Sequence, residues 1–90
     1  MKATRFLIDG AVQGVGYRYF ARRAALELGI RGFVRNLPDG TVEALAAGAA
    51  EAIRAFAERL RQGPRGSRVD SIESWEIESI EEVTGFEIRP

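Results

Sequence analysis

The sequence predicts a small α+β domain in which two helices cover one face of an antiparallel sheet. Three observations lead to this prediction. Two segments carry apolar residues at the three- and four-residue spacing of amphipathic helices. The segments around them are short, with alternating apolar and polar residues or runs of apolar ones, as in strands. The resulting order of strand, helix, strand, strand, helix, strand is that of a split βαβ unit.

The first strand and the first helix are separated by a glycine-containing loop. Residues 4–9 are predicted as a strand, because Phe6 and Ile8 alternate with polar neighbours. A helix is predicted over residues 17–28, and Gly29 stands where a glycine typically ends a helix. The apolar stripe of this helix consists of Tyr17, Phe20, Ala21, Ala24, Ala25 and Leu28.

The middle of the chain predicts a hairpin followed by the second helix. Residues 30–36 and 41–46 are expected to pair as strands, because the Pro-Asp-Gly sequence between them strongly favours a turn. The second helix is predicted over roughly residues 49–61, and Gly63-Pro64 ends it. Its apolar face consists of Ile53, Phe56, Ala57 and Leu60.

The C-terminal strands are less regular in sequence. Val69 and Ile72 are out of phase with Trp75 for a strict two-residue period, so a bulge or bend is predicted near Ser71. A short last strand is predicted around residues 86–88.

Composition limits the chemistry of the chain. Ninety residues are expected to form one domain spanning residues 1–90. Thirteen basic and thirteen acidic residues cancel, so no global positive charge favours nucleic acid or an anionic membrane surface as a partner. Without cysteine or histidine, the chain has no thiolate nucleophile, thiolate metal site or imidazole base. The N-terminal apolar run is too short for a signal peptide, and a cytoplasmic protein is expected.

The loop between the first strand and the first helix has the features of an anion-binding site. Residues 10–18 read Gly-Ala-Val-Gln-Gly-Val-Gly-Tyr-Arg. Glycines allow successive N–H groups to turn toward one point, and the start of the helix adds its own free N–H groups and dipole. Arg18 is unfavourable near a helix N-terminus unless an anion lies nearby. A phosphate would relieve this conflict and accept the paired donors of a guanidinium group.

Two common phosphate-binding motifs do not fit this loop. A dinucleotide fingerprint needs a third glycine where Tyr19 stands, and the chain is too short for a doubly wound sheet. A nucleoside triphosphate loop needs a Gly-Lys-Ser/Thr ending, which is absent from the sequence.

Five segments of the chain fit a known pattern: Val12 to Arg18, Ala24 to Gly29, Gly32 to Asn36, Asp39 to Glu43, and Gly63-Pro64. With these segments the sequence resembles the acylphosphatase family over nearly its whole length. The resemblance implies a ferredoxin-like βαββαβ sandwich. Because the chain ends at Pro90 with no attached domain, a free-standing enzyme is expected. The chain departs from the family at Ala11, where a basic or polar residue is common, and at Tyr17, where phenylalanine is frequent.

By this resemblance, the protein hydrolyses the carboxyl–phosphate bond of acyl phosphates, and no metal or cofactor is expected. Arg18 and Asn36 are the implied catalytic residues: Arg18 would supply positive charge to the phosphate, and Asn36 would orient the attacking water. A carboxylate leaves readily, so this chemistry needs positioning and charge more than a general acid. The implied phosphate-binding loop comprises Gln13, Gly14, Val15, Gly16, Tyr17 and Arg18.

Other interpretations of the same residues remain open. Asn36 suits a turn, and Gln13 alone would serve as a cap for loop backbone. Arg35, Arg65 and Arg68 are left out of the site as solvated surface charges. The aromatic residues Phe33, Trp75, Tyr17 and Tyr19 are expected to pack in the core or on the sheet.

The alternative function is a phosphate- or anion-binding regulatory module without turnover. An RNA-binding sheet is disfavoured by the zero net charge and the missing aromatic motif. Kinship with an acylphosphatase-like domain of a larger carbamoyl-phosphate-handling protein is a third possibility. A monomer is expected.

Overall fold

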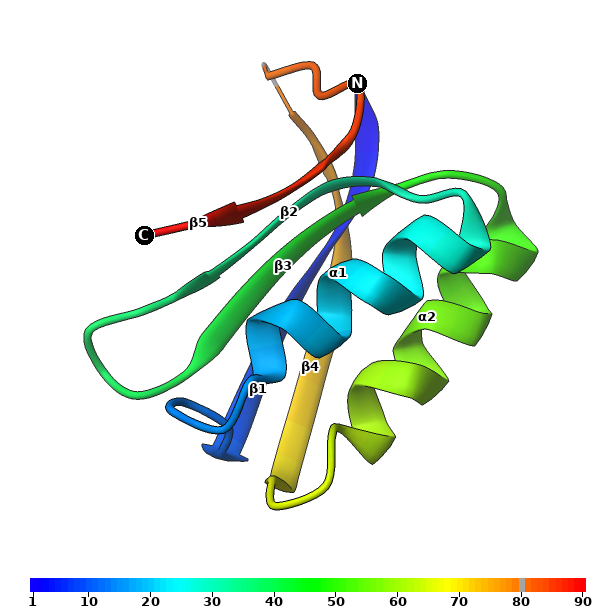
Figure 1. Cartoon of the computed structure of the whole chain (residues 1–90). Coiled ribbons are helices and arrows are strands. Elements are labelled where there is room, and N and C mark those ends of the chain that lie inside the picture. The colour runs from blue at the N-terminus through cyan, green and yellow to red at the C-terminus, as the bar shows by residue number, and fades with distance from the viewer. Residues whose placement is uncertain (80) are drawn as a thin grey trace.

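The computed structural model describes residues 1–79 and 81–90. Two helices and five strands follow one another in the predicted order, with a fifth strand at the C-terminus (Figure 1). Every predicted element is present, and the observed bounds lie within about two residues of the expected ones at most ends. The elements are β1 (Lys2–Ala11), α1 (Tyr17–Leu28), β2 (Arg31–Asn36), β3 (Val42–Ala47), α2 (Ala50–Gln62), β4 (Arg68–Glu78) and β5 (Phe86–Arg89).

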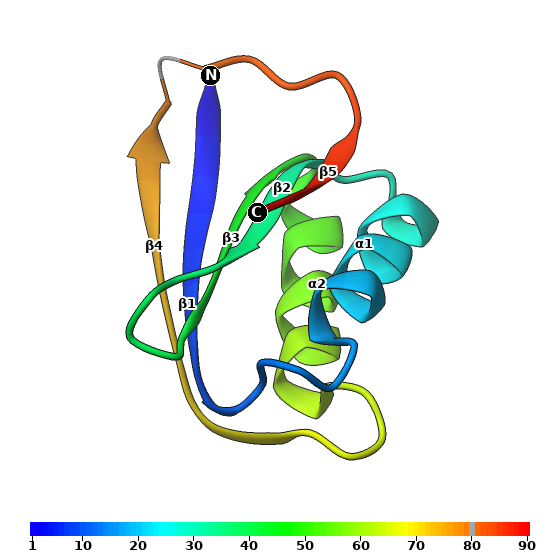
Figure 2. The same cartoon turned by 60° about the vertical axis from the view of Figure 1, so that its left-hand side comes forward.

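The strands form one five-stranded sheet in the order β4-β1-β3-β2-β5, and both helices cover the same face of it (Figures 1 and 2). This confirms the predicted ferredoxin-like fold. Three of the four strand pairings are antiparallel, namely β1 with β3, β1 with β4 and β2 with β3, whereas β5 pairs with β2 in parallel at one edge. The sheet is therefore mixed, and the expectation of a wholly antiparallel sheet was wrong for β5.

The predicted irregularity in β4 is a bulge against β1. The register shifts between Asp9, which pairs with Ser71, and Gly10, which pairs with Val69, so Asp70 is the extra residue. Gly10 has φ +137°, and a Cβ there would lie 2.0 Å from the carbonyl oxygen of Arg68. Only glycine lets the two strands approach this closely.

The main core lies between the sheet and the helices. Phe56 of α2 is fully buried and makes edge-to-face contacts with Phe6 of β1 and Phe86 of β5, each with ring centroids 5.8 Å apart. Four of the six residues of the predicted apolar stripe of α1 are buried, Phe20 and Leu28 are partly buried, and Gly29 ends this helix with φ +70°. Because one ring of α2 touches both a central and an edge strand, the core fixes β5 to the rest of the sheet.

The other face of the sheet carries ion pairs and aromatic residues. Glu43 is buried at 4% exposure and accepts hydrogen bonds from both Arg5 and Arg35. The Arg5 guanidinium lies 5.1 Å from the centre of the Trp75 ring, and that of Arg89 lies 4.0 Å from the centre of Phe33. Phe33 and Trp75 are therefore sheet-packing residues, as expected.

Candidate active site

The loop between β1 and α1 has the backbone of an anion-binding site. Gly14 and Gly16 have φ values of +76° and +79°, and a Cβ on either would meet nothing within 4 Å. The glycines are therefore required by backbone conformation rather than by lack of space. Gly16 is the N-cap of α1 and provides no side-chain cap, and the first turn contains no acidic residue. The free N–H groups of this turn are thus left for an external acceptor.

A small cavity joins this loop to the end of β2. Its volume is about 80 Å³. Arg18 and Asn36, which the sequence singled out separately, both line it, whereas the side chains of Gln13 and Val15 do not. The complete lining is Val12, Gly14, Gly16, Tyr17, Arg18, Tyr19 and Asn36.

The guanidinium of Arg18 is oriented by backbone and not neutralised by a carboxylate. Its Nη1 donates a hydrogen bond to the carbonyl oxygen of Arg89 in β5, at 2.9 Å. Arg22, one turn later, donates in the same way to the carbonyl oxygen of Phe86, at 3.1 Å. Within residues 1–79 and 81–90, no ion pair involves either arginine. Arg18 therefore presents its full charge and its other N–H donors at the cavity.

Asn36 brings an unsatisfied acceptor to the same cavity. It is the last residue of β2, and its Oδ1 is buried without a hydrogen-bond donor among the described residues. Leaving a buried carbonyl oxygen unpaired costs about 1–3 kcal/mol. A buried acceptor in this state needs a donor that the described residues do not supply, such as a bound water or ligand.

Gln13 holds the loop against the β2–β3 turn. Its Nε2 donates to the carbonyl oxygens of Leu37 and Thr41, both at 2.9 Å. These bonds fix the turn that directly follows Asn36, so the side chain acts on backbone, as one of the sequence interpretations expected. The sequence singled out the Gln13 side chain, but it did not show that the acceptors would be carbonyl oxygens of the distant β2–β3 hairpin.

Tyr17 anchors the start of α1 to the end of α2. The side chain is buried, and its hydroxyl donates to the carbonyl oxygen of Leu60 at 2.6 Å. Burial raises the pKa of the Tyr17 hydroxyl well above its usual value. Tyr17 is therefore a packing residue, as expected. Tyr19 is not: the expectation that it packs inside was wrong, because its side chain is 71% exposed at the cavity. Tyr19 lies outside the apolar stripe of α1, and the helix turns this position outward.

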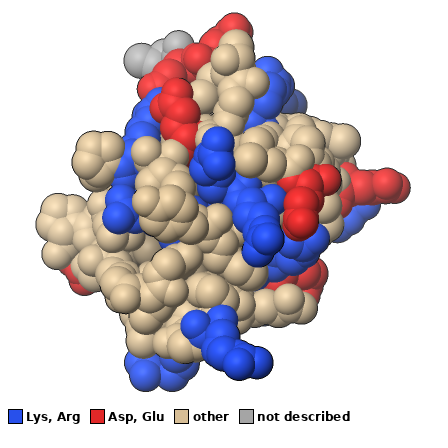
Figure 3. Space-filling model, in the orientation of Figure 1, with Lys and Arg blue, Asp and Glu red and all other residues tan. Residues whose placement is uncertain are grey.

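The surface around α1 is locally basic although the chain has no net charge. In Figure 3, basic side chains gather across the middle of the face that α1 occupies in Figure 1. Arg35 and Arg68, which the sequence placed outside the site, pair instead with Glu43 and Asp70. Arg18 and Arg22, by contrast, form no ion pair in the part of the chain that the structure describes.

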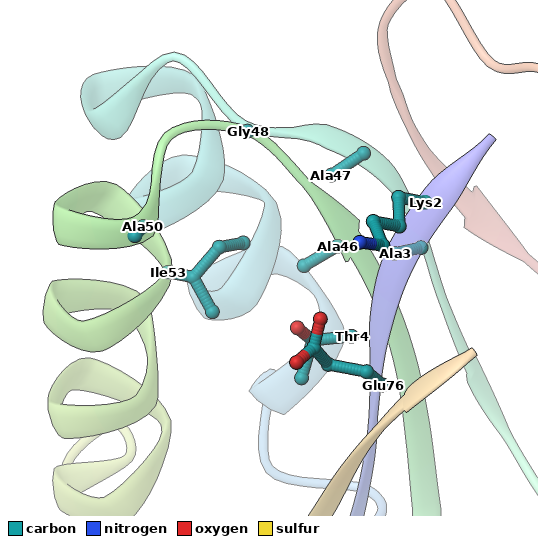
Figure 4. Close-up of a pocket in the computed structure, with 9 residues that line it drawn as sticks. All are labelled: Lys2, Ala3, Thr4, Ala46, Ala47, Gly48, Ala50, Ile53 and Glu76. Atoms are coloured by element: carbon teal, nitrogen blue, oxygen red, sulfur yellow. The ribbon is translucent and has the colours of Figure 1, made fainter. Parts of the chain in front are cut away.

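A larger cavity of about 300 Å³ lies elsewhere, between the N-terminal end of β1 and the start of α2 (Figure 4). Thr4, which lines it, pairs with Ala46, whereas Ile8 and Asn36 both pair with Val42 at the other end of β3. The two cavities therefore lie at opposite ends of the strands. Five of the nine residues that line the larger one are alanine or glycine, and its polar lining residues are Lys2, Thr4 and Glu76. It shares no lining residue with the cavity that holds Arg18 and Asn36.

Two further features bear on the site. Over residues 1–79 and 81–90, no group of three or more acidic side chains is arranged to hold a metal ion. Neither helix in that part of the chain is long and apolar enough to cross a membrane.

Comparisons with known proteins agree closely with this fold. Residues 4–88 match the family model described as acylphosphatase. The chain is 51% identical over 89 residues to the acylphosphatase of Methanocella arvoryzae, covering 99% of this chain and 100% of that protein. It superposes on the crystal structure of acylphosphatase from Bacillus subtilis with a TM-score of 0.93 and 39% identity, covering 100% of both chains. It also matches 12% of the chain of T. kodakarensis HypF, with a TM-score of 0.89 and 39% identity over 99% of this chain.

Proposed function

The chain belongs to the acylphosphatase family, and we propose that it hydrolyses acyl phosphates with residues 13–18 as phosphate-binding loop and with Arg18 and Asn36 as catalytic residues. The observation that carries this assignment is the cavity that joins the loop to the end of β2. There, Arg18, which forms no ion pair within residues 1–79 and 81–90, and Asn36, whose Oδ1 has no hydrogen-bond donor among those residues, line the same small space.

The loop and the first turn of α1 bind the phosphoryl group. Backbone N–H groups between Gln13 and Arg18 donate to its peripheral oxygens, supported by the positive end of the helix dipole. What supports this role is the left-handed backbone at Gly14 and Gly16, with a first turn that has no acidic residue. These donors are already in position before substrate arrives, so they need little reorganisation in the transition state.

Arg18 stabilises the negative charge that spreads over the phosphoryl oxygens as the bond to the acyl group breaks. A guanidinium group offers two parallel donors to such oxygens, whereas a lysine ammonium acts as a point charge. Because one N–H of Arg18 is held by the Arg89 carbonyl, the group is oriented by β5 and retains donors for the phosphate. A resident metal ion is not required in this mechanism, because arginine and backbone supply the positive charge.

Asn36 orients the attacking water. Its unpaired Oδ1 accepts a hydrogen bond from that water and aims the oxygen at phosphorus. An amide is too weak a base to remove the proton, so its contribution is positional. As the water oxygen bonds to phosphorus, the bond from phosphorus to the carboxyl oxygen breaks. The carboxylate leaves with the electron pair of that bond, and the proton of the water passes to the phosphate.

The direct test is hydrolysis of benzoyl phosphate by the purified chain with EDTA present. The proposal predicts enzymatic turnover under these conditions, with inorganic phosphate as a competitive inhibitor. Absence of turnover by the folded protein, together with measurable phosphate binding, would contradict the proposal and indicate an anion-binding module instead.

The same proposal includes the physical state of the protein. We expect residues 1–90 to act as one domain, as a monomer in the cytoplasm, on small acyl phosphates and not on nucleic acid or membranes. Support for one domain comes from the single sheet on which both helices pack. Light scattering of the purified chain and fractionation of cells that express it test the remaining points.

A further inference from the structure

Tyr19 is the exposed aromatic residue at the candidate active site. Three large hydrophobic side chains are exposed in the described part of the chain: Tyr19, Leu26 and Trp75. Trp75 lies against the guanidinium of Arg5 on the far face of the sheet. Tyr19 is 71% exposed, and within residues 1–79 and 81–90 its ring forms no aromatic pair and no contact with a cation. Of the three residues, only Tyr19 lines the cavity that holds Arg18 and Asn36.

The cavity has room for the phosphoryl group and little else. At about 80 Å³ it is far below the roughly 300–1,000 Å³ of pockets that enclose a whole small molecule. The acyl group of a bound substrate must therefore extend out of the cavity. Outside, it contacts the exposed side chains at the edge of the cavity.

Among the residues that line the cavity, Tyr19 has the side chain suited to that contact. Val12 and Tyr17 are each 1% exposed and belong to the core. Gly14 and Gly16 have no side chains, and the space beside them is open. Arg18 and Asn36 serve the phosphate and the water in the proposed mechanism. The free ring of Tyr19 is the one large apolar surface left for the acyl group.

We propose that the ring of Tyr19 forms the acyl-group contact of the enzyme and favours acyl phosphates with a planar, apolar acyl group over those with a short one. This inference rests on the proposed function. A planar acyl group can stack on the ring or meet it edge to face, and either geometry strengthens binding beyond the area it buries. An acetyl group is too small to cover the ring and gains little from it.

The experiment compares kcat/KM for benzoyl phosphate and acetyl phosphate in the wild type and in Tyr19→Ala. We expect Tyr19→Ala to lower kcat/KM for benzoyl phosphate about three- to tenfold and to change the value for acetyl phosphate less than about twofold. Inhibition by inorganic phosphate should stay unchanged, because the ring does not touch the phosphoryl group. Tyr19→Phe keeps the ring and should behave like the wild type. Trp75→Ala removes an exposed ring far from the cavity and should leave kcat/KM unchanged for both substrates.

The outcomes separate this inference from the function on which it rests. Equal losses for both substrates, or no loss for either, would overturn the role of Tyr19 while leaving the enzyme intact. Weaker phosphate inhibition in Tyr19→Ala would also overturn the role of Tyr19, since the residue would then act on the phosphate-binding loop. If folded wild-type protein hydrolyses neither substrate, the proposed function itself fails. Thermal unfolding of each variant shows that the fold is retained, as expected for an exposed side chain.

Discussion

The hydroxyl of Tyr17 is the part of this chain whose contribution to stability can be worked out most fully. The substitution Tyr17→Phe removes one buried hydrogen bond, 2.6 Å long, to the carbonyl oxygen of Leu60, and leaves the ring in place. Losing such a bond and leaving the carbonyl without its donor costs about 1–2 kcal/mol. For a domain of this size, each kcal/mol lowers Tm by about 4–8 °C. We therefore expect Tyr17→Phe to lower Tm by roughly 5–15 °C at pH 7.

The same hydroxyl predicts a pH dependence. Burial raises the pKa of Tyr17 in the folded state above the value of about 10 that it has in the unfolded chain. The folded state then binds the phenolic proton more tightly than the unfolded chain does. The stabilisation by the neutral hydroxyl is therefore fully present below about pH 10 and is lost as the pH rises further, by about 1.4 kcal/mol per pH unit. The stability difference between wild type and Tyr17→Phe should close by about pH 11.5.

Urea unfolding of the wild type and Tyr17→Phe at several pH values between 7 and 11.5 measures both effects. Tyr19→Phe is the matched control, because it removes a hydroxyl from an exposed tyrosine two residues away and should change Tm very little. The activity of Tyr17→Phe should stay within about twofold of the wild type, since the ring of residue 17 continues to anchor α1. Equal stability of wild type and Tyr17→Phe at pH 7, or a difference that stays constant up to pH 11.5, would refute this reasoning.

Three other predictions concern single residues. Gly10→Ala should destabilise the fold by more than about 4 kcal/mol, because its Cβ would lie 2.0 Å from a carbonyl oxygen. The control Gly48→Ala, whose Cβ would have no contact under 3.5 Å, should leave Tm nearly unchanged in thermal unfolding. Glu43→Gln should cost roughly 1–3 kcal/mol in urea unfolding, because the buried carboxylate bonds two arginines, while Glu58→Gln, in an exposed pair, should cost almost nothing. Arg18→Lys should remain at least about tenfold below wild type in kcat, because lysine lacks the paired donors; full activity would contradict the assigned role.

The sequence predicted the local parts of this fold well because their signals lie in neighbouring residues. The stripe of α1, the hairpin of β2 and β3, and the phase break at the bulge are each visible within a dozen residues. The direction of β5 was not predictable in this way. It has four residues, and its parallel pairing with β2 depends on Phe86 packing against Phe56 from another element.

The candidate site likewise combines local features that the sequence predicts with long-range contacts that it does not. The glycine loop and the conflict at Arg18 could be inferred from sequence, and the family resemblance added Asn36. The partners that orient the site could not be, since they come from distant segments: the Arg89 carbonyl for Arg18, the Leu37 and Thr41 carbonyls for Gln13, and the Leu60 carbonyl for Tyr17. The exposure of Tyr19 was also missed: the helical period leaves this residue outside the apolar stripe, but its aromatic side chain favoured an expectation of packing.

The division of labour between Arg18 and Asn36 is the central claim, and one set of measurements tests it most directly. We would measure kcat for benzoyl phosphate and the inhibition constant of inorganic phosphate in Arg18→Ala, Asn36→Ala and Arg22→Ala. Arg22 is the matched control, because it also donates to a β5 carbonyl but does not line the cavity. Arg18→Ala should lose about 10²–10³ in kcat and bind phosphate weakly, and Arg22→Ala should resemble the wild type. Asn36→Ala should lose kcat while binding phosphate almost as well as the wild type; an equal loss of phosphate binding in Asn36→Ala would contradict the account.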